Sequence, residues 1–280
     1  MPTPTIAVLL TCHNRRDKTV QCLTAFYAQA GLGEFYTIEV FLVDDASTDG
    51  TGEAIKNQFP LVNIILGNGN LFWNRGMHLA WKTASATKDF DYYLWLNDDT
   101  FLYENAINNM LEVAEETQNQ AAICGSTFSL ESKKISYGGN SKEGSLLIPN
   151  GGLQETYSFN GNVVLIPNFV SNKVGILDPR FPHAIGDYEY ALRIRKNNLK
   201  SFIAKDFVGS CEGNEKLPNW CSPSFSLIKR TQSLYSPLGN SHPYYFFLFE
   251  IKYYGSTAAI KHFISIHLRL LFPQLWIKRK

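Results

Sequence analysis

Two adjacent carboxylates, Asp98 and Asp99, follow an apolar run at residues 92–96 of this 280-residue sequence. An apolar run of this length between polar residues is typical of a buried strand. Like charges so close together disfavour each other's ionisation unless a cation lies between them. The pair therefore indicates either a divalent metal site with hard oxygen ligands or an Asp-Asp-Thr turn that caps the helix after it.

Other polar side chains follow other apolar runs in the same way. Thr11, His13 and Asn14 come after the apolar run at 6–10, and Asp45 comes after the run at 38–43. A carboxylate at a strand end can accept a hydrogen bond from a nucleotide base, and it can also stabilise a helix N-terminus. Both interpretations of Asp45 stay open on the residues alone.

The elements that must position these side chains alternate along the chain. Apolar runs at 6–10, 38–43, 62–66 and 92–96 alternate with helical patterns at 17–30, 51–59, 74–86 and 103–117. This alternation predicts an α/β fold with a doubly wound, mostly parallel sheet flanked by helices. Ligands of such sheets bind outside the carboxyl ends of the strands. The first strand is not followed by G-x-G-x-x-G, and no Walker A motif occurs, so the two common nucleotide folds are disfavoured.

The second half of the chain is less regular. Further strands are expected at 123–127, 162–167 and 200–204, and residues 132–152 indicate hairpins or a mobile acceptor loop. A helix at 257–272 places six residues on one face: Ile260, Phe263, Ile264, His267, Leu268 and Leu271. Such a basic amphipathic helix lies on an anionic membrane or packs its apolar face on the catalytic domain or a twin subunit.

Composition excludes several classes. Hydrophobic residues make up 45% of the chain, and the net charge of +1 gives no reason to expect a nucleic acid partner. Five scattered cysteines without a C-x-x-C spacing indicate reduced thiols in the cytoplasm. The first residues do not resemble a signal peptide, and no apolar run is long enough to cross a bilayer. We expect a cytoplasmic protein, at most peripheral at the inner face of the cell membrane.

Three motifs in order carry a family resemblance: Thr11-Cys12-His13-Asn14-Arg15, residues 44–49 (DDASTD) and Asn97-Asp98-Asp99, each behind a strand. Over about residues 5–210 the chain resembles the family 2 glycosyltransferases of the GT-A fold. It is similar to the rhamnosyltransferase-like branch of bacterial surface-polysaccharide synthesis. The resemblance implies a GT-A catalytic domain at 1–212 and a helical C-terminal extension at 213–280.

The resemblance also assigns roles at the donor. It implies that the nucleotide-sugar donor contacts seven residues: Thr11, His13, Asn14, Asp45, Asn74, Arg75 and Asp98. His13 departs from the tyrosine that is commoner in the family. Asp98 and Asp99 match the family's metal motif, so Mn²⁺ or Mg²⁺ is expected to bridge the two phosphates and stabilise the leaving diphosphate. Cys211 falls near the position where relatives often have a metal-binding histidine, which leaves the third protein ligand without a candidate.

The segment around Asp187 is similar to the family's acidic motif at the start of a helix. On that match Asp187 is the general base that deprotonates the acceptor hydroxyl, and the sugar is transferred with inversion. The other interpretation of Asp187 is a helix N-cap. Gly186 stands where the family often has Glu, and His183 and Glu189 are expected on the acceptor side.

Together these expectations describe an inverting, metal-dependent glycosyltransferase that acts on a growing glycan or a lipid-linked glycan. Two other classes stay open from the sequence. A sugar-phosphate nucleotidyltransferase would use a similar fold, and a non-catalytic scaffold protein would bind the nucleotide without turnover.

Overall fold

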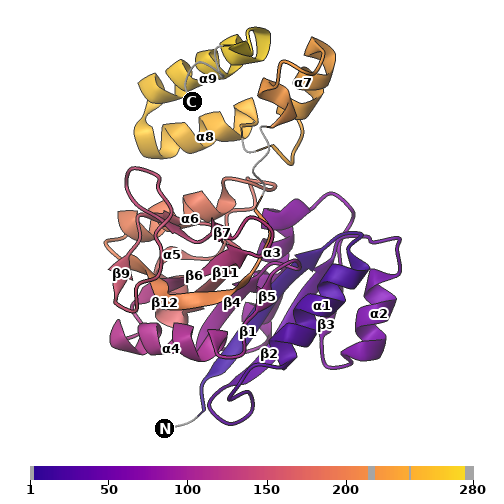
Figure 1. The fold of residues 1–280 in the computed structure, drawn as a ribbon, viewed down its shortest axis with the longest axis vertical. Helices are drawn as coiled ribbons and strands as arrows, with labels where there is room; N and C mark the ends of the chain where they lie inside the picture. The colour runs from indigo at the N-terminus through magenta and orange to yellow at the C-terminus, as the bar shows by residue number, and fades with distance from the viewer. Residues whose placement is uncertain (1–2, 214–217, 240, 275–280) are drawn as a thin grey trace.

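A computed structural model describes residues 3–213, 218–239 and 241–274 of the chain (Figure 1). Its strands are β1 (Thr5–Cys12), β2 (Thr37–Asp44), β3 (Asn63–Leu66), β4 (Tyr92–Leu96), β5 (Phe101–Leu102), β6 (Ala121–Ser129), β7 (Lys134–Tyr137), β8 (Gly139–Asn140), β9 (Gln154–Glu155), β10 (Ser158–Phe159), β11 (Val163–Pro167) and β12 (Lys200–Ser210). Its helices are α1 (Arg16–Tyr27), α2 (Thr51–Gln58), α3 (Phe72–Thr87), α4 (Ala106–Glu116), α5 (Asn168–Val174), α6 (Gly186–Lys196), α7 (Leu227–Leu234), α8 (Pro243–Tyr254) and α9 (Ser256–Leu271), with a 3₁₀ turn at Asn219–Cys221.

One mixed sheet organises residues 5–210 of the chain. Its strands lie in the order β3-β2-β1-β4-β11-β6-β12-β5, and β1 to β4 are parallel to one another. β11 runs antiparallel to both of its neighbours, β4 and β6. The predicted α/β fold is confirmed, and the carboxyl ends of β1, β2 and β4 meet at one edge of the sheet.

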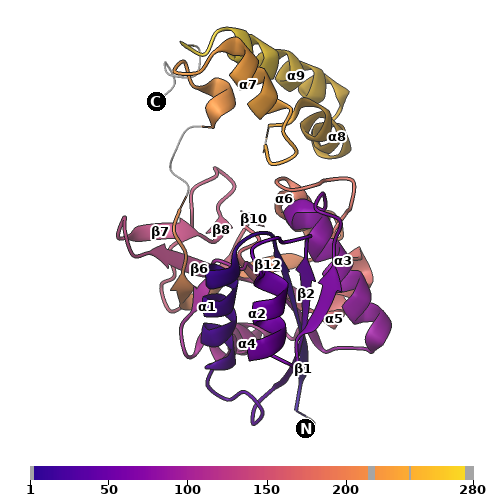
Figure 2. The ribbon, with the colours of Figure 1, turned by 90° about the vertical axis from the view of Figure 1, so that its right-hand side faces the viewer.

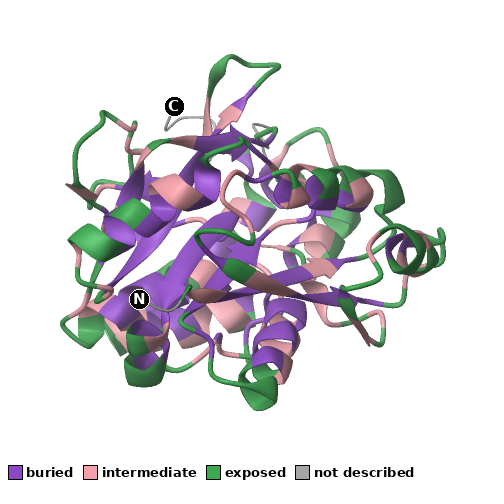
Figure 3. Ribbon diagram, turned by 90° about the horizontal axis from the view of Figure 1, so that it is seen from below, coloured by how far each residue is buried: buried purple, intermediate pink, exposed green. Residues whose placement is uncertain are grey.

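The core lies on both faces of this sheet, and its inner strands β1, β4 and β11 are largely buried (Figure 3). Helices α1, α2 and α4 cover one face, and α3, α5 and α6 cover the other (Figure 2). The inner strands are apolar along their whole length because helices cover them on both sides. Trp81 and Trp95 are fully buried on the face covered by α3, α5 and α6, where their rings stack edge to face. Both rings also contact the ring of Tyr190.

Helices α7 to α9 form a C-terminal lobe above the sheet (Figure 1). Inside the lobe, Ile266 and Leu270 of α9 pack against Trp220 and Leu234. The lobe rests on the part of the chain that contains the sheet through Phe249 of α8, which packs against an apolar cluster of Phe181, Ile185 and Leu192. Among the described residues, no helix has both the length and the apolar character needed to cross a membrane.

The structure bears on one of the alternatives for the apolar face of α9, its packing on the domain that contains the sheet. The residues that pack inside the lobe are Ala259, Ile266 and Leu270, whereas Ile260, Phe263, Ile264, Leu268 and Leu271 are 40–52% exposed. The predicted face therefore does not cover the catalytic domain. Within the lobe, Phe263 of the predicted face contacts the ring of Phe247 in α8, and His267 is hydrogen-bonded to the hydroxyl of Tyr235.

Candidate active site

Two adjoining cavities lie at the carboxyl edge of the sheet, and each contains one part of the predicted chemistry. The first, here called the acid-pair cavity, has a volume of about 660 Å³. It brings together five of the predicted donor and metal residues: Thr11, His13, Asp45, Asp98 and Asp99. These residues come from the ends of β1, β2 and β4, as the parallel sheet requires.

Asp98 and Asp99 converge on one positive charge. The guanidinium Nη1 of Arg15 donates to Oδ1 of Asp98 at 3.0 Å and to Oδ2 of Asp99 at 2.7 Å. Burial raises the pKa of Asp98 to about 6, although the charge of Arg15 opposes this shift. The other carboxylate oxygen of Asp98 is buried without a hydrogen-bond partner. Two carboxylates that can both reach one cation, with one oxygen unused, fit a divalent metal ion.

Cys211 lies beside this acid pair as a hydrogen-bond donor. Its thiol is within 3.8 Å of Asp99 Oδ1 and within 3.6 Å of the side-chain amide of Asn162. Burial raises the pKa of the Cys211 thiol to about 12, so the sulfur keeps its proton and donates to the carboxylate. Within the described residues, no group of three His, Cys, Asp or Glu side chains could hold a metal. Among the described residues, Asp98 and Asp99 are therefore the candidates to hold a metal ion.

Asp45 organises the loop that walls the acid-pair cavity. Its buried carboxylate accepts hydrogen bonds from the backbone amides of Gly69, Leu71 and Phe72 at 2.7–3.2 Å. A Cβ atom at Gly67 would lie 2.5 Å from Asp45 Oδ1, so the loop closes on the carboxylate only with glycine there. Helix α3 packs closely over the side chain of Thr11. This close approach requires glycine at Gly76, because a Cβ atom there would collide with Thr11. The loop at residues 67–72 is thus fixed by the acid that the sequence singled out.

Three predicted donor residues do not line the acid-pair cavity. The amide of Asn74 is fully buried and donates to the carbonyls of Asp178 and Phe181, and the guanidinium of Arg75 donates to the carbonyl of Pro179. Both side chains hold the loop before α6 to the start of α3. Asn14 accepts from the backbone amide of Thr48 through its side chain. These contacts place the three side chains outside the lining of the acid-pair cavity, and their donor-binding roles stay predictions.

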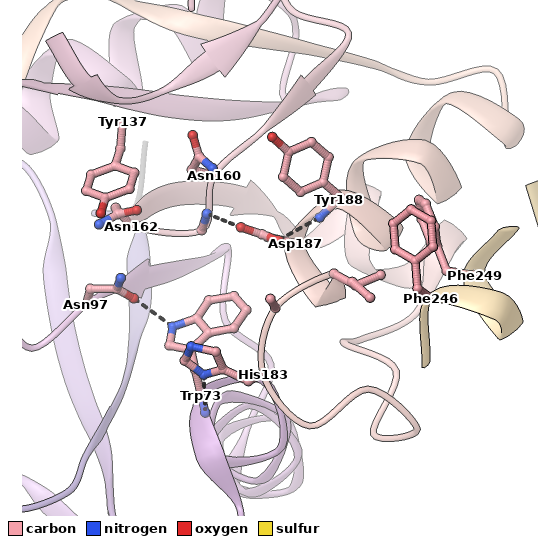
Figure 4. A pocket seen from close by; sticks show the side chains of 13 residues that line it. Trp73, Asn97, Tyr137, Asn160, Asn162, His183, Asp187, Tyr188, Phe246 and Phe249 are labelled. Atoms are coloured by element: carbon pink, nitrogen blue, oxygen red, sulfur yellow. Dashed lines mark hydrogen bonds between the residues drawn. The ribbon is translucent and has the colours of Figure 1, made fainter. Parts of the chain in front are cut away.

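The second cavity, here called the Asp187 cavity, has a volume of about 490 Å³ (Figure 4). Asp187 lies in the first turn of α6, where its carboxylate accepts from the backbone amides of Gly161 at 2.9 Å and Tyr188 at 2.8 Å. Burial raises the pKa of Asp187. The N-cap position of α6 is Ile185, so Asp187 is not the N-cap. A desolvated carboxylate with a raised pKa that borders a cavity is suited to accept a proton.

The turn before Asp187 is held in an unusual conformation. Ile185 has φ 79°, a left-handed backbone that β-branched residues rarely adopt. A Cβ atom at Gly186 would lie 2.0 Å from Oδ1 of Asn74, so α3 and α6 approach too closely for a larger residue. This packing explains why the chain has Gly186 at the position where the family that it resembles often has Glu. The strained turn orients the side chain of Asp187 toward the Asp187 cavity.

The two cavities are neighbours. Five residues line both of them: Trp73, Asn97, Tyr137, Asn162 and His183. The indole Nε1 of Trp73 donates to Asn97 Oδ1 at 2.6 Å, and the backbone amide of Trp73 donates to His183 Nδ1 at 3.4 Å (Figure 4). Burial lowers the pKa of His183. Its imidazole is therefore neutral and carries its proton on Nε2, as a hydrogen-bond donor.

Glu189 does not belong to the Asp187 cavity. Its carboxylate is fully buried and pairs with Arg193 at 2.9 Å and with Lys252 of α8 at 2.6 Å. The phenol of Tyr253 donates to the same carboxylate at 2.7 Å. The prediction that Glu189 faces the acceptor is wrong, because residues two apart on a helix do not share a face. Its role is to join α6 to the C-terminal lobe.

Sequence reasoning missed several residues at these cavities. Arg15 was part of a quoted motif, but its partners are 83 and 84 residues away, and no spacing rule links them. Asn97 immediately precedes the acid pair, and this adjacency was an available signal. Trp73 packs edge to face against Trp95 and also lines both cavities.

Comparison with known families gives a match over part of the chain. Residues 7–137, just under half of the sequence, match the family described as Glycosyl transferase family 2. The match includes both acid pairs and the Arg15 motif, so the predicted resemblance to that family is confirmed. A search of curated proteins found no match.

Several solved structures share the fold. The S. aureus TarS 1-349 structure has a TM-score of 0.56 at 12% identity, with 73% of this chain and 59% of that chain covered. The same S. aureus fragment in complex with UDP-GlcNAc has a TM-score of 0.56 at 11% identity, with 95% and 72% covered. The mannosyltransferase PcManGT from Pyrobaculum calidifontis, in complex with GDP-Man and Mn²⁺, has a TM-score of 0.57 at 17% identity, with 97% and 75% covered. The chain thus spans less than two thirds of the first of these structures.

Proposed function

We propose that this chain, which matches Glycosyl transferase family 2 over residues 7–137 and shares the fold of PcManGT, is a glycosyltransferase that transfers a sugar, with inversion, from a nucleotide-diphosphate donor to a hydroxyl of a growing glycan. One observation carries the proposal: the acid-pair cavity and the Asp187 cavity share five lining residues. A sugar held at their junction would have its diphosphate beside Asp98 and Asp99 and its other side open to Asp187. This arrangement is what direct displacement at an anomeric carbon needs.

Asp187 supplies the general base in this proposal. Its carboxylate takes the proton of the acceptor hydroxyl as the oxygen forms a bond to the anomeric carbon. The bond from that carbon to the diphosphate oxygen breaks, and the diphosphate leaves with the electron pair. Because attack and departure occur on opposite sides of the carbon, the configuration inverts. The amides of Gly161 and Tyr188 fix the orientation of the carboxylate.

Asp98 and Asp99 would hold Mn²⁺ or Mg²⁺, which supplies positive charge for the leaving diphosphate when bound. The unused, buried oxygen of Asp98 and the convergence of both carboxylates support this assignment. The structure of PcManGT contains Mn²⁺ with GDP-Man, which is consistent with a metal in this fold. Arg15 would be free to contact the diphosphate once a cation takes its place between the acids.

The donor nucleotide would occupy the acid-pair cavity next to Thr11, His13 and the loop that Asp45 holds. Similar structures contain UDP-GlcNAc or GDP-Man, so both kinds of donor deserve testing. We keep the rhamnosyltransferase-like, surface-polysaccharide assignment as a proposal, with a glycan or a lipid-linked glycan as acceptor.

We further propose that the protein works in the cytoplasm, at the inner face of the cell membrane. All five cysteines are buried free thiols, as expected in a reducing compartment. The exposed apolar side chains of α9 are interspersed with Lys261 and Arg269, a combination that suits an anionic membrane. The part of this prediction that falls on residues 275–280 lies outside the described residues.

The proposal is tested by measuring thermal stability with UDP, GDP, UDP-GlcNAc and GDP-mannose, each with and without Mn²⁺. A ligand at a hundredfold excess over its Kd stabilises the folded state by about 2.7 kcal/mol. We expect one nucleotide to raise the Tm strongly, and only with Mn²⁺ present. Equal shifts with and without Mn²⁺ would contradict the metal assignment, and no shift with any nucleotide would contradict the donor site.

A further inference from the structure

A third cavity lies beyond Asp187, between the catalytic part and the C-terminal lobe. It has a volume of about 450 Å³ and is here called the α8–α9 cavity. Among the described residues, three side chains line both this cavity and the Asp187 cavity: Tyr188, Phe246 and Phe249. They stand on the side of Asp187 away from Trp73 and Asn97 (Figure 4). An extended molecule that reaches Asp187 could therefore continue past these rings.

The walls of the α8–α9 cavity are aromatic and hydroxylated. Tyr157, Tyr188 and Tyr254 contribute rings with hydroxyl groups, Phe246 and Phe249 contribute apolar rings, and Ser141 and Ser158 add further hydroxyls. Aromatic faces combined with a few hydrogen-bonding groups match the alternating apolar faces and hydroxyl edges of a sugar ring.

The charges around this cavity favour a neutral ligand over a diphosphate. Glu250 is buried, and its carboxylate lies 2.7 Å from Nδ1 of His262, so the two groups are engaged with each other and an anion would meet a carboxylate here. Lys142, in the loop after β8, is the other charged residue that lines the cavity within the described part of the chain. A diphosphate would meet one lysine beside a carboxylate, whereas a sugar would meet hydroxyl groups and rings.

We propose that the α8–α9 cavity is a second acceptor subsite, which binds the sugar ring next to the one that is glycosylated. The preferred acceptor is then a glycan of at least two neutral sugar rings. The inference rests on the proposed function, and it assigns Tyr254 and Ala258, which line this cavity and not the Asp187 cavity, to acceptor length selection.

The experiment measures nucleotide release by the full chain from UDP-GlcNAc and GDP-mannose. The acceptors are methyl glycosides of glucose, galactose, mannose, N-acetylglucosamine and rhamnose, each compared with a disaccharide that extends it at the reducing end. We expect kcat/KM to be about tenfold higher for the two-ring member of the pair that is used, which corresponds to about 1.4 kcal/mol.

Two variants test the location of the second ring. Tyr254→Ala removes a wall, and Ala258→Trp fills the space; each should abolish the tenfold preference while leaving the one-ring rate unchanged. Tyr244→Ala is the matched control, because Tyr244 is exposed on the same helix and lines none of these cavities. Circular dichroism confirms that each variant is folded.

Equal kcat/KM for one-ring and two-ring acceptors would overturn the second subsite, as would a preference that survives both variants. Nucleotide release that no acceptor accelerates would overturn the proposed function, and the subsite with it. The two failures are distinct, because the first leaves acceptor-dependent turnover intact.

Discussion

Lys252 of α8 lies 2.6 Å from the carboxylate of Glu189, two residues after Asp187 in α6. This contact ties the C-terminal lobe to the helix that carries the proposed base. Glu189 is fully buried, and Arg193 and Tyr253 share its carboxylate. The lobe is therefore held against the catalytic part by a charged cluster as well as by the apolar contacts of Phe249.

Glu189→Gln should destabilise the protein by about 3 kcal/mol, because it leaves Arg193 and Lys252 without their shared anion in a buried setting. Chemical denaturation measures the change in the free energy of unfolding. Lys205→Ala is a useful control, since Lys205 pairs with Glu112 and Glu116 at the surface and should change stability much less. A larger loss for the Lys205 variant would contradict the role given to Glu189.

The pH dependence of turnover should have an acid limb near pH 6. Burial raises the pKa of Asp98 to about 6 and also raises the pKa of Asp187. Both carboxylates must be ionised, one to hold a cation and the other to accept a proton, so activity should rise with pH through this region. The pH profile of kcat/KM measures the limb. A profile that stays flat down to pH 4.5 would contradict the assignment.

Arg15→Met should move the Asp98 part of that limb to higher pH. The positive charge of Arg15 favours the ionised form of Asp98, so its removal lets burial raise the pKa further. The readout is Mn²⁺-dependent nucleotide binding as a function of pH, compared with Arg16→Met, whose side chain pairs with Asp17 instead. A shift to lower pH in the Arg15 variant would contradict the inference that Arg15 favours the ionised form of Asp98.

Ile264→Glu should reduce binding to liposomes that contain phosphatidylglycerol by at least about tenfold, because Ile264 is exposed on α9 and would no longer enter the apolar part of the bilayer. Cosedimentation measures the bound fraction. Thr257→Glu introduces the same charge at another exposed position of α9 and should have a smaller effect. Equal binding by wild type and Ile264→Glu would argue against a membrane contact through this face.

Much of the fold followed from the sequence because its strands are apolar runs buried on both faces. The ends of β1, β2 and β4 were predicted well enough to place Thr11, Asp45, Asp98 and Asp99 at one edge. Helix α8 was not predicted, since its residues 243–254 are aromatic on all sides and show no clear helical period.

The differences between the predicted and the observed site have a common cause: a polar residue near a ligand site is not necessarily turned toward it. Asn74 and Arg75 sit at a helix start, as expected of anion-binding groups, but their side chains bond to the carbonyls of residues 178–181. That loop is about a hundred residues further along the chain, so no local sequence pattern predicts that these side chains bind to it. For Glu189, in contrast, helical periodicity alone would have separated it from Asp187.

The central claim is that Asp187 acts as the base while Asp98 and Asp99 anchor the diphosphate through a metal ion. The most direct test measures transfer rate and Mn²⁺-dependent nucleotide affinity in Asp187→Asn and Asp99→Ala. We predict that Asp187→Asn lowers kcat by about 10²- to 10⁴-fold with unchanged nucleotide affinity, and that Asp99→Ala loses the gain in affinity that Mn²⁺ gives. Wild-type transfer rates in both variants would contradict the account.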